Sequence, residues 1–188
     1  MSRLVGMAEN IRVPETVITV EKFEAGGKAL EEAMRNGIIT AENTIDFINE
    51  ARIYFNHIIR INAQGEKEVV KIATDNCVEV VKVVEEFFKT GKINTAAFSE
   101  AQQYRELAKL YNRRFITYNL GTLRTEEEIM AIGDRGILLC ERGPGLKSHV
   151  INILKLEKDR LKYIEGQVIS NELNLLGEFK TFKFMKTN

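Results

Sequence analysis

The stretch RGPGLKSHVINILKLEKDRLKYIEGQ, residues 142–167, decides how the second half of the chain folds. Apolar residues recur with a period near two in SHVINILKLEK and RLKYIEGQVI, and the turn residues GPG and EKD bound these runs. This pattern predicts antiparallel strands joined by short turns. His149 stands at the mouth of one strand and Glu165 lies on the next. Because neighbouring antiparallel strands return to the same end of a sheet, we expect the two side chains to lie close together.

Strands are predicted on both sides of this stretch as well. RGILLCERG, residues 135–143, precedes it, and GEFKTFKFMK, residues 177–186, follows it with the alternation of a half-buried edge strand. TVITVEKF at residues 16–23 is typical of extended chain. Helical spacing predicts helices over residues 26–37, 40–62, 77–90 and 95–114, with a short one opened by the capping box TEEEIM at 125–130. Helices followed by an antiparallel sheet predict an α+β fold.

Composition excludes several classes of function. The 188 residues carry 27 Lys and Arg against 27 Asp and Glu, so no general basic field is available for nucleic acid. Cys77 and Cys140 are too few for a disulfide framework, which favours free thiols in the cytosol. The N-terminus lacks a signal-peptide core, and no run approaches the roughly 18 apolar residues of a membrane span.

The most reactive group predicted by the sequence is the thiol of Cys77. TDNC, residues 74–77, places it at the start of an apolar helix, where the helix dipole and unpaired N–H groups favour a thiolate. His149 can then act as the base and Glu165 can orient it. Cys140, inside GILLC, is expected to be a core residue. The cysteines and histidines are too scattered for a zinc site, and GPG precedes a strand, so it is not a phosphate loop.

Four motifs taken together carry a family resemblance. TDNC at a helix start, RGIL on a strand, a Gly-rich turn leading into HVINIL, and YIEGQ one hairpin later resemble the papain-like fold toxin domains of bacterial polymorphic toxin systems. The resemblance covers roughly residues 70–170. It implies a papain-like cysteine hydrolase with Cys77 as nucleophile, His149 as general acid and base, and Glu165 as orienter. Glu165 stands where the family usually has Asp.

The resemblance also implies a substrate class and partners. Members act on amide bonds as peptidases, glutamine deamidases or acyl-transferring enzymes, without a cofactor. The family's oxyanion-hole Gln has no counterpart here, so the backbone N–H of Cys77 and the side chain of Asn76 are expected to take its place. Ser148 and Gln167 are expected to line the site.

A toxin of this family would act in the cytoplasm of a target cell after export as part of a larger protein. Its expected partners are a protein substrate and a cognate immunity protein, with no nucleic acid. The papain-like domain is expected over residues 66–188, and residues 1–65 form a mainly helical segment that serves as delivery portion, linker or packing extension.

Two other interpretations stay open on the sequence alone. The chain could be a papain-like binding or regulatory module without catalysis, which the Glu at position 165 favours. It could also be a helical structural protein of a phage or mobile element, in which Cys77 and His149 would lie far apart. Thiol reactivity separates the first alternative from an enzyme, because a relic site has no need of a thiolate.

Overall fold

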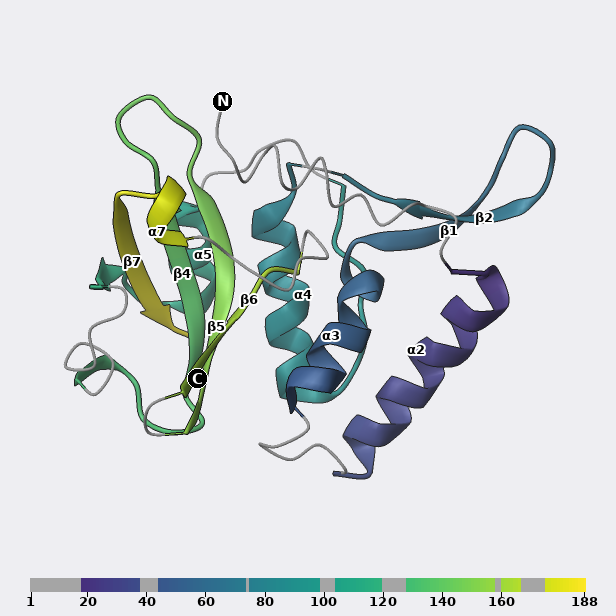
Figure 1. Ribbon diagram of the computed structural model, residues 1–188, viewed down its shortest axis with the longest axis horizontal. Helices are drawn as coiled ribbons and strands as arrows, with labels where there is room; N and C mark the ends of the chain where they lie inside the picture. The colour runs from purple at the N-terminus through teal and green to yellow at the C-terminus, as the bar shows by residue number, and fades with distance from the viewer. Residues whose placement is uncertain are drawn as a thin grey trace.

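The computed structural model describes residues 18–37, 44–73, 75–98, 104–119, 128–157, 160–166 and 175–188. It combines helices with antiparallel sheets, which confirms the α+β class (Figure 1). The larger sheet has the strand order β3-β7-β4-β5-β6, and every neighbouring pair is antiparallel. Its strands are β3 (Ile116–Thr117), β4 (Arg135–Glu141), β5 (His149–Glu157), β6 (Arg160–Ile164) and β7 (Thr181–Lys186).

The three strands predicted between residues 135 and 165 are confirmed, but the predicted edge position of the last strand is wrong. β7 lies between β4 and β3, because Ile116 and Thr117 pair with Phe184 and Lys183 along its outer side. Two faces of the sheet are covered, so GILLC in β4 is apolar throughout. Ile137 and Leu139 pack with residues of α4 (Cys77–Thr90) and α5 (Arg105–Tyr111). On the other face, Leu138 and Cys140 pack with Phe179, Phe182 and Phe184.

Helix α4 lies between the larger sheet and α3 (Thr44–Phe55) (Figure 1). Its valines point both ways: Val78 and Val81 join the cluster on the sheet, and Val80 and Val84 join the cluster with α3. This burial on two sides stabilises a helix whose β-branched residues have a low intrinsic propensity. The helix ends at Gly91, whose φ of 73° suits a glycine C-cap.

The first described helix begins at Val20, earlier than the helix predicted from residue 26. Helix α2 (Val20–Arg35) includes much of the segment expected to be extended, because the Thr19 hydroxyl accepts a hydrogen bond from the Lys22 N–H at 3.2 Å and caps it. Gly26 and Gly27 lie inside this helix, where Tyr54 of α3 (Thr44–Phe55) packs against them. A Cβ at Gly26 would overlap the Tyr54 hydroxyl. The close approach of two helices therefore explains the glycine pair.

The helix predicted over residues 40–62 ends early, at Phe55. A hairpin follows, formed by β1 (His57–Ile61) and β2 (Lys67–Lys71), which extends away from the body beside α2 (Figure 1). The isoleucines in HIIRI suit a strand, and Gly65 adopts a φ of 79° in the turn. Helical spacing continued through this run by coincidence, so the period alone gave the wrong element.

The expected division at residues 65 and 66 falls in the turn of this hairpin. One hydrophobic cluster joins residues from both sides of the division: Leu30, Ala51, Tyr54 and Phe55 from the first part, and Val80, Val84, Phe87, Ala96, Leu154, Leu156 and Ile164 from the second. The described residues before the division thus share one hydrophobic core with α4 and the larger sheet.

The remaining helices are short. Helix α5 (Arg105–Tyr111) is the described part of the helix expected over residues 95–114, and residues 95–98 are not helical. Helix α7 (Leu175–Glu178) leads into β7. Residues 125–127 of TEEEIM lie outside the described residues, and residues 128 and 129 are helical. Among the helices that the structure describes, none has both the length and the apolar character needed to cross a membrane.

Candidate active site

Cys77 is the first residue of α4 and is partly exposed. The helix start holds it at the edge of the cluster formed by Val78, Val81 and the sheet. Its side chain makes a hydrogen bond with the imidazole of His149. Residues separated by 72 positions in the chain are thus in direct contact (149 − 77 = 72). The interpretation as a helical structural protein expected these two residues to lie far apart, and the contact contradicts that expectation.

His149 is the first residue of β5 and pairs across the sheet with Cys140 of β4. Its Nε2 is hydrogen-bonded to a carboxylate oxygen of Glu165. The hydrogen bond with Cys77 is made by the same imidazole. The imidazole therefore links the thiol to the acid, as a base with an orienting partner would.

Glu165 directly follows β6, whose last paired residue, Ile164, faces Asn152 of β5. This register brings it to the end of the sheet where β5 begins, as predicted. It is 5% exposed, and Gly166 beside it lies against Val80, Val84 and Phe55. The bond to His149 forms with Glu at this position, so the longer side chain does not prevent the contact.

The electrostatics of the site favour a charged imidazole. Burial lowers the pKa of His149, but the Glu165 carboxylate and the hydrogen bonds with Cys77 and Glu165 outweigh burial and raise it to about 10, from 6.5. At neutral pH His149 is therefore an imidazolium between two potential anions. A charged imidazole beside a thiol can donate a proton to a leaving group during a reaction.

One aromatic ring, that of Phe179, lies beside the imidazole and also contacts Arg142. The His149 ring stacks on Phe179 with ring centres 6.4 Å apart and planes 15° apart. The Arg142 guanidinium lies 4.6 Å from the centre of the same Phe179 ring. Arg142 also donates to the Lys147 carbonyl at 2.6 Å and pairs with Glu178 at 3.7 Å. The loop before His149 and the end of α7 therefore restrict how the histidine ring can turn.

The structure corrects the role expected for Asn76. Its amide nitrogen donates to the Asn56 side-chain oxygen at 2.8 Å and to the Ala97 carbonyl at 3.2 Å. Both N–H groups of the amide are thereby used, and none remains for an oxyanion. Asn76 also makes no side-chain capping bond to α4, although it occupies the N-cap position. Its role is to fix the chain just before Cys77.

Ser148 and Gln167 were expected to line the site, and Cys140 was expected to lie in the core. Ser148 is half-buried directly before His149. Gln167 lies outside the described residues. Cys140 is 0% exposed, and burial raises the pKa of its thiol above the ordinary range, which confirms that it is a core residue. The loop of residues 143–147 reaches toward the start of α4, because Lys147 pairs with Asp75 at 3.7 Å.

Arg52 and Asn56, in and just after the last turn of α3, were missed in the sequence. Arg52 is 3% exposed; burial lowers the pKa of its guanidinium, and the nearby Glu165 carboxylate raises it. Asn56 is fully buried and holds Asn76. A signal was present: Arg52 stands four residues after Ile48 and three before Phe55, so a charge interrupts the apolar face of the helix.

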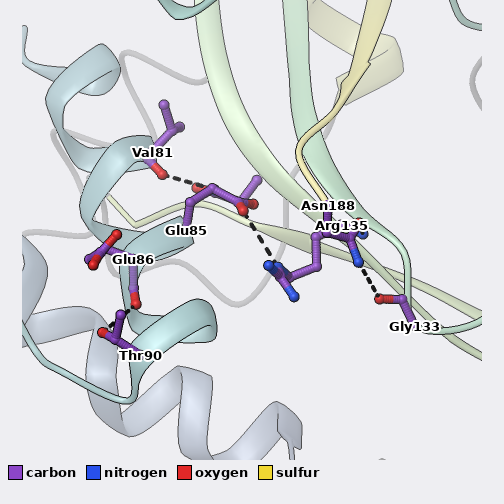
Figure 2. Close-up of polar contacts among 8 residues, drawn as sticks. Val81, Glu85, Glu86, Thr90, Gly133, Arg135 and Asn188 are labelled. Atoms are coloured by element: carbon purple, nitrogen blue, oxygen red, sulfur yellow. Dashed lines mark hydrogen bonds and ion pairs between the residues drawn. The ribbon is translucent and has the colours of Figure 1, made fainter. Parts of the chain in front are cut away.

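A second buried acid lies further along α4. Figure 2 shows the Arg135 guanidinium directed at the Glu85 carboxylate, with Arg135 Nε and Glu85 Oε2 3.4 Å apart. Asn152 of β5 donates to the Val81 carbonyl of α4 at 3.1 Å. Burial raises the pKa of Glu85, while Thr187, Arg135 and Asn152 oppose the rise. No thiol or histidine takes part in these contacts, so this group joins helix to sheet.

Comparison of the chain with protein-family models, with curated proteins and with solved structures found no match. Within the described ranges no group of three or more His, Cys, Asp or Glu side chains is placed to hold a metal ion.

Proposed function

We propose that the protein is a cysteine-dependent hydrolase of amide bonds. The observation that carries the proposal is the continuous contact from Cys77 through His149 to Glu165. A partly exposed thiol at a helix start, a charged imidazole and a buried carboxylate have the types and the order that nucleophilic catalysis requires. Each comes from a different element, so their meeting is a product of the tertiary fold.

The proposed reaction has two steps. The Cys77 sulfur attacks the amide carbonyl carbon, and the C–N bond breaks as the His149 imidazolium gives its proton to the departing nitrogen. The product is a thioester. Water then attacks the thioester carbon, His149 takes the proton of the water, and the carboxylic acid leaves as Cys77 is restored. Glu165 keeps the imidazole oriented and stabilises its positive charge throughout.

The substrate class separates two forms of this activity. If the departing nitrogen belongs to a peptide bond, the protein is a peptidase; if it is the side-chain amide of glutamine, ammonia leaves and the protein is a deamidase. The resemblance to papain-like toxin domains supports a role in bacterial competition, with a protein substrate in the cytoplasm of the target cell and a cognate immunity protein. A non-catalytic binding module has less support, because Glu165 makes the contact that an orienting acid needs.

The test is tightly induced expression in the bacterial cytoplasm of the parent and of Cys77→Ala, at matched protein levels. We expect only the parent to stop growth. Mass spectrometry of the lysates then names the reaction, since deamidation adds about 1 Da to glutamine and cleavage creates new peptide termini. Cys140→Ala is the matched control, because it removes the other thiol but not the site.

An assay of the purified protein on the same lysate proteins repeats the test in vitro, where growth of the host plays no part. We expect Cys77→Ala to lose at least about 1000-fold in rate with its thermal unfolding unchanged. A Cys77→Ala variant that is as active as the parent, or a parent that modifies no protein and whose Cys77 reacts with iodoacetamide no faster than a small-molecule thiol, would refute the proposal.

A further inference from the structure

The end of α3 is bonded to the segments on both sides of Cys77. The Asn56 side chain accepts from the Asn76 amide and donates to the Ala73 carbonyl, both at 2.8 Å. Its backbone carbonyl accepts from the Ile72 N–H at 2.9 Å. The carbonyl of Phe55 accepts from the Ala96 N–H at 2.8 Å. The chain that leads into α4 and the chain that follows it are thus both held by α3.

The same end of α3 reaches Glu165. Phe55 lies 3.7 Å from where a Cβ of Gly166 would be, next to Glu165 in the chain. Arg52 precedes Phe55 by three residues, on the same side of the helix, and is buried. A buried guanidinium is costly unless an anion compensates it, and Glu165 is a buried acid that acts on it.

Two cationic side chains act on Glu165: the imidazole of His149, which can gain and lose a proton, and the guanidinium of Arg52. Since its guanidinium stays protonated in proteins, Arg52 can keep Glu165 fixed whether or not His149 carries a proton during a reaction cycle.

We propose that Arg52 is a positioning residue of the active site, which holds the Glu165 carboxylate toward His149 from helix α3. The inference rests on the proposed function for its role in catalysis. It makes residues 44–56 part of the enzyme, where the sequence predicted a separate segment. The groups that raise the pKa of His149 are Glu165 and Cys77, so Arg52 acts on the histidine through Glu165.

The test is the titration of His149 by NMR, which needs no substrate. The chain has two histidines, His57 and His149, so a histidine-labelled sample gives one signal from the site and one internal reference. We compare the parent with Arg52→Gln and Arg52→Lys. Arg60→Gln is the matched control, because Arg60 is exposed and pairs with Glu68 on the hairpin.

In Arg52→Gln we expect the His149 midpoint to fall by about one pH unit or more, because the carboxylate is no longer held in place. Arg52→Lys, which keeps the charge, should stay within about half a unit of the parent. Arg60→Gln should leave both histidines unchanged. In a Glu165→Gln background, Arg52→Gln should move the His149 midpoint no further, because its effect passes through that carboxylate.

An equal His149 midpoint in Arg52→Gln and Arg60→Gln overturns the inference. If the neutral variant does not fold, Arg52→Lys decides alone: a fall as large as that of Glu165→Gln overturns it. These outcomes are separate from the proposed function. A chain without activity can still show the coupling, and an active enzyme can lack it.

Discussion

Two buried acids, Glu165 beside α4 and Glu85 within it, have different partners, and the difference separates a group suited to a reaction from one that holds the fold together. Glu165 bonds to His149, a group that can gain and lose a proton, and through it reaches a partly exposed thiol. Glu85 faces Arg135, which keeps its proton, and its surroundings are helix and sheet (Figure 2). An acid that bonds to a side chain able to gain and lose a proton can support a reaction. An acid that pairs with a permanent cation joins two structural elements.

The largest expected effect that tests this difference is that of Glu165→Gln. We expect activity on the lysate substrate to fall about 100-fold, because the imidazole loses its orienting charge. The pKa of His149 should fall toward 6.5, the ordinary value from which Glu165 and Cys77 raise it. Rate measurements and histidine NMR check the two halves of the prediction. Unchanged activity would mean that Glu165 is as structural as Glu85.

The loss of stability in Glu165→Gln relative to the parent should also depend on pH. The folded-state pKa of His149, about 10, lies above its unfolded value of 6.5, so the stabilisation from its charge is fully present below 6.5 and is lost as the pH rises through 10. The difference in unfolding free energy between the parent and Glu165→Gln should therefore shrink across this window. Urea unfolding at pH 6, 8 and 10 measures it, and a difference that stays constant contradicts the ion pair.

Glu85→Ala should lower the stability of the fold and leave the reactivity of the site unchanged. We expect the unfolding free energy to fall by about 2 kcal/mol, at the low end for a broken buried pair, because Arg135 is partly exposed and can be hydrated. The alkylation rate of Cys77 should stay as in the parent. Glu86→Ala is the matched control, since Figure 2 shows Glu86 directed away from Arg135 on the same helix. An equally large loss of stability in Glu86→Ala would mean that the Glu85–Arg135 pair makes no specific contribution to stability.

The smallest effect is expected from Lys147→Met. This change breaks the exposed pair with Asp75, next to the site, and should alter the unfolding free energy by less than about 0.5 kcal/mol. Thermal unfolding checks this expectation. A change in the Michaelis constant with equal stability would assign the loop of residues 143–147 to substrate binding.

Much of the fold could be predicted because its signals are local. The strands from residue 135 to 164 and the start of α4 follow from alternation and turn residues over a few positions. The errors occurred where two local signals overlapped. HIIRI continued a helical period yet formed β1, and TVITVEKF has strand-forming residues yet is largely helical from Val20.

The sequence by itself determined that Cys77 begins a helix, that His149 begins a strand, and that Glu165 lies at the end of the next one. Only the tertiary structure decided that Asn76 binds Asn56 and cannot serve an oxyanion, and that Arg52 approaches Glu165. The physical reason is distance along the chain. Capping and periodicity act within a few residues, but the meeting of residues 52, 77, 149 and 165 depends on how α3 and α4 pack against the sheet.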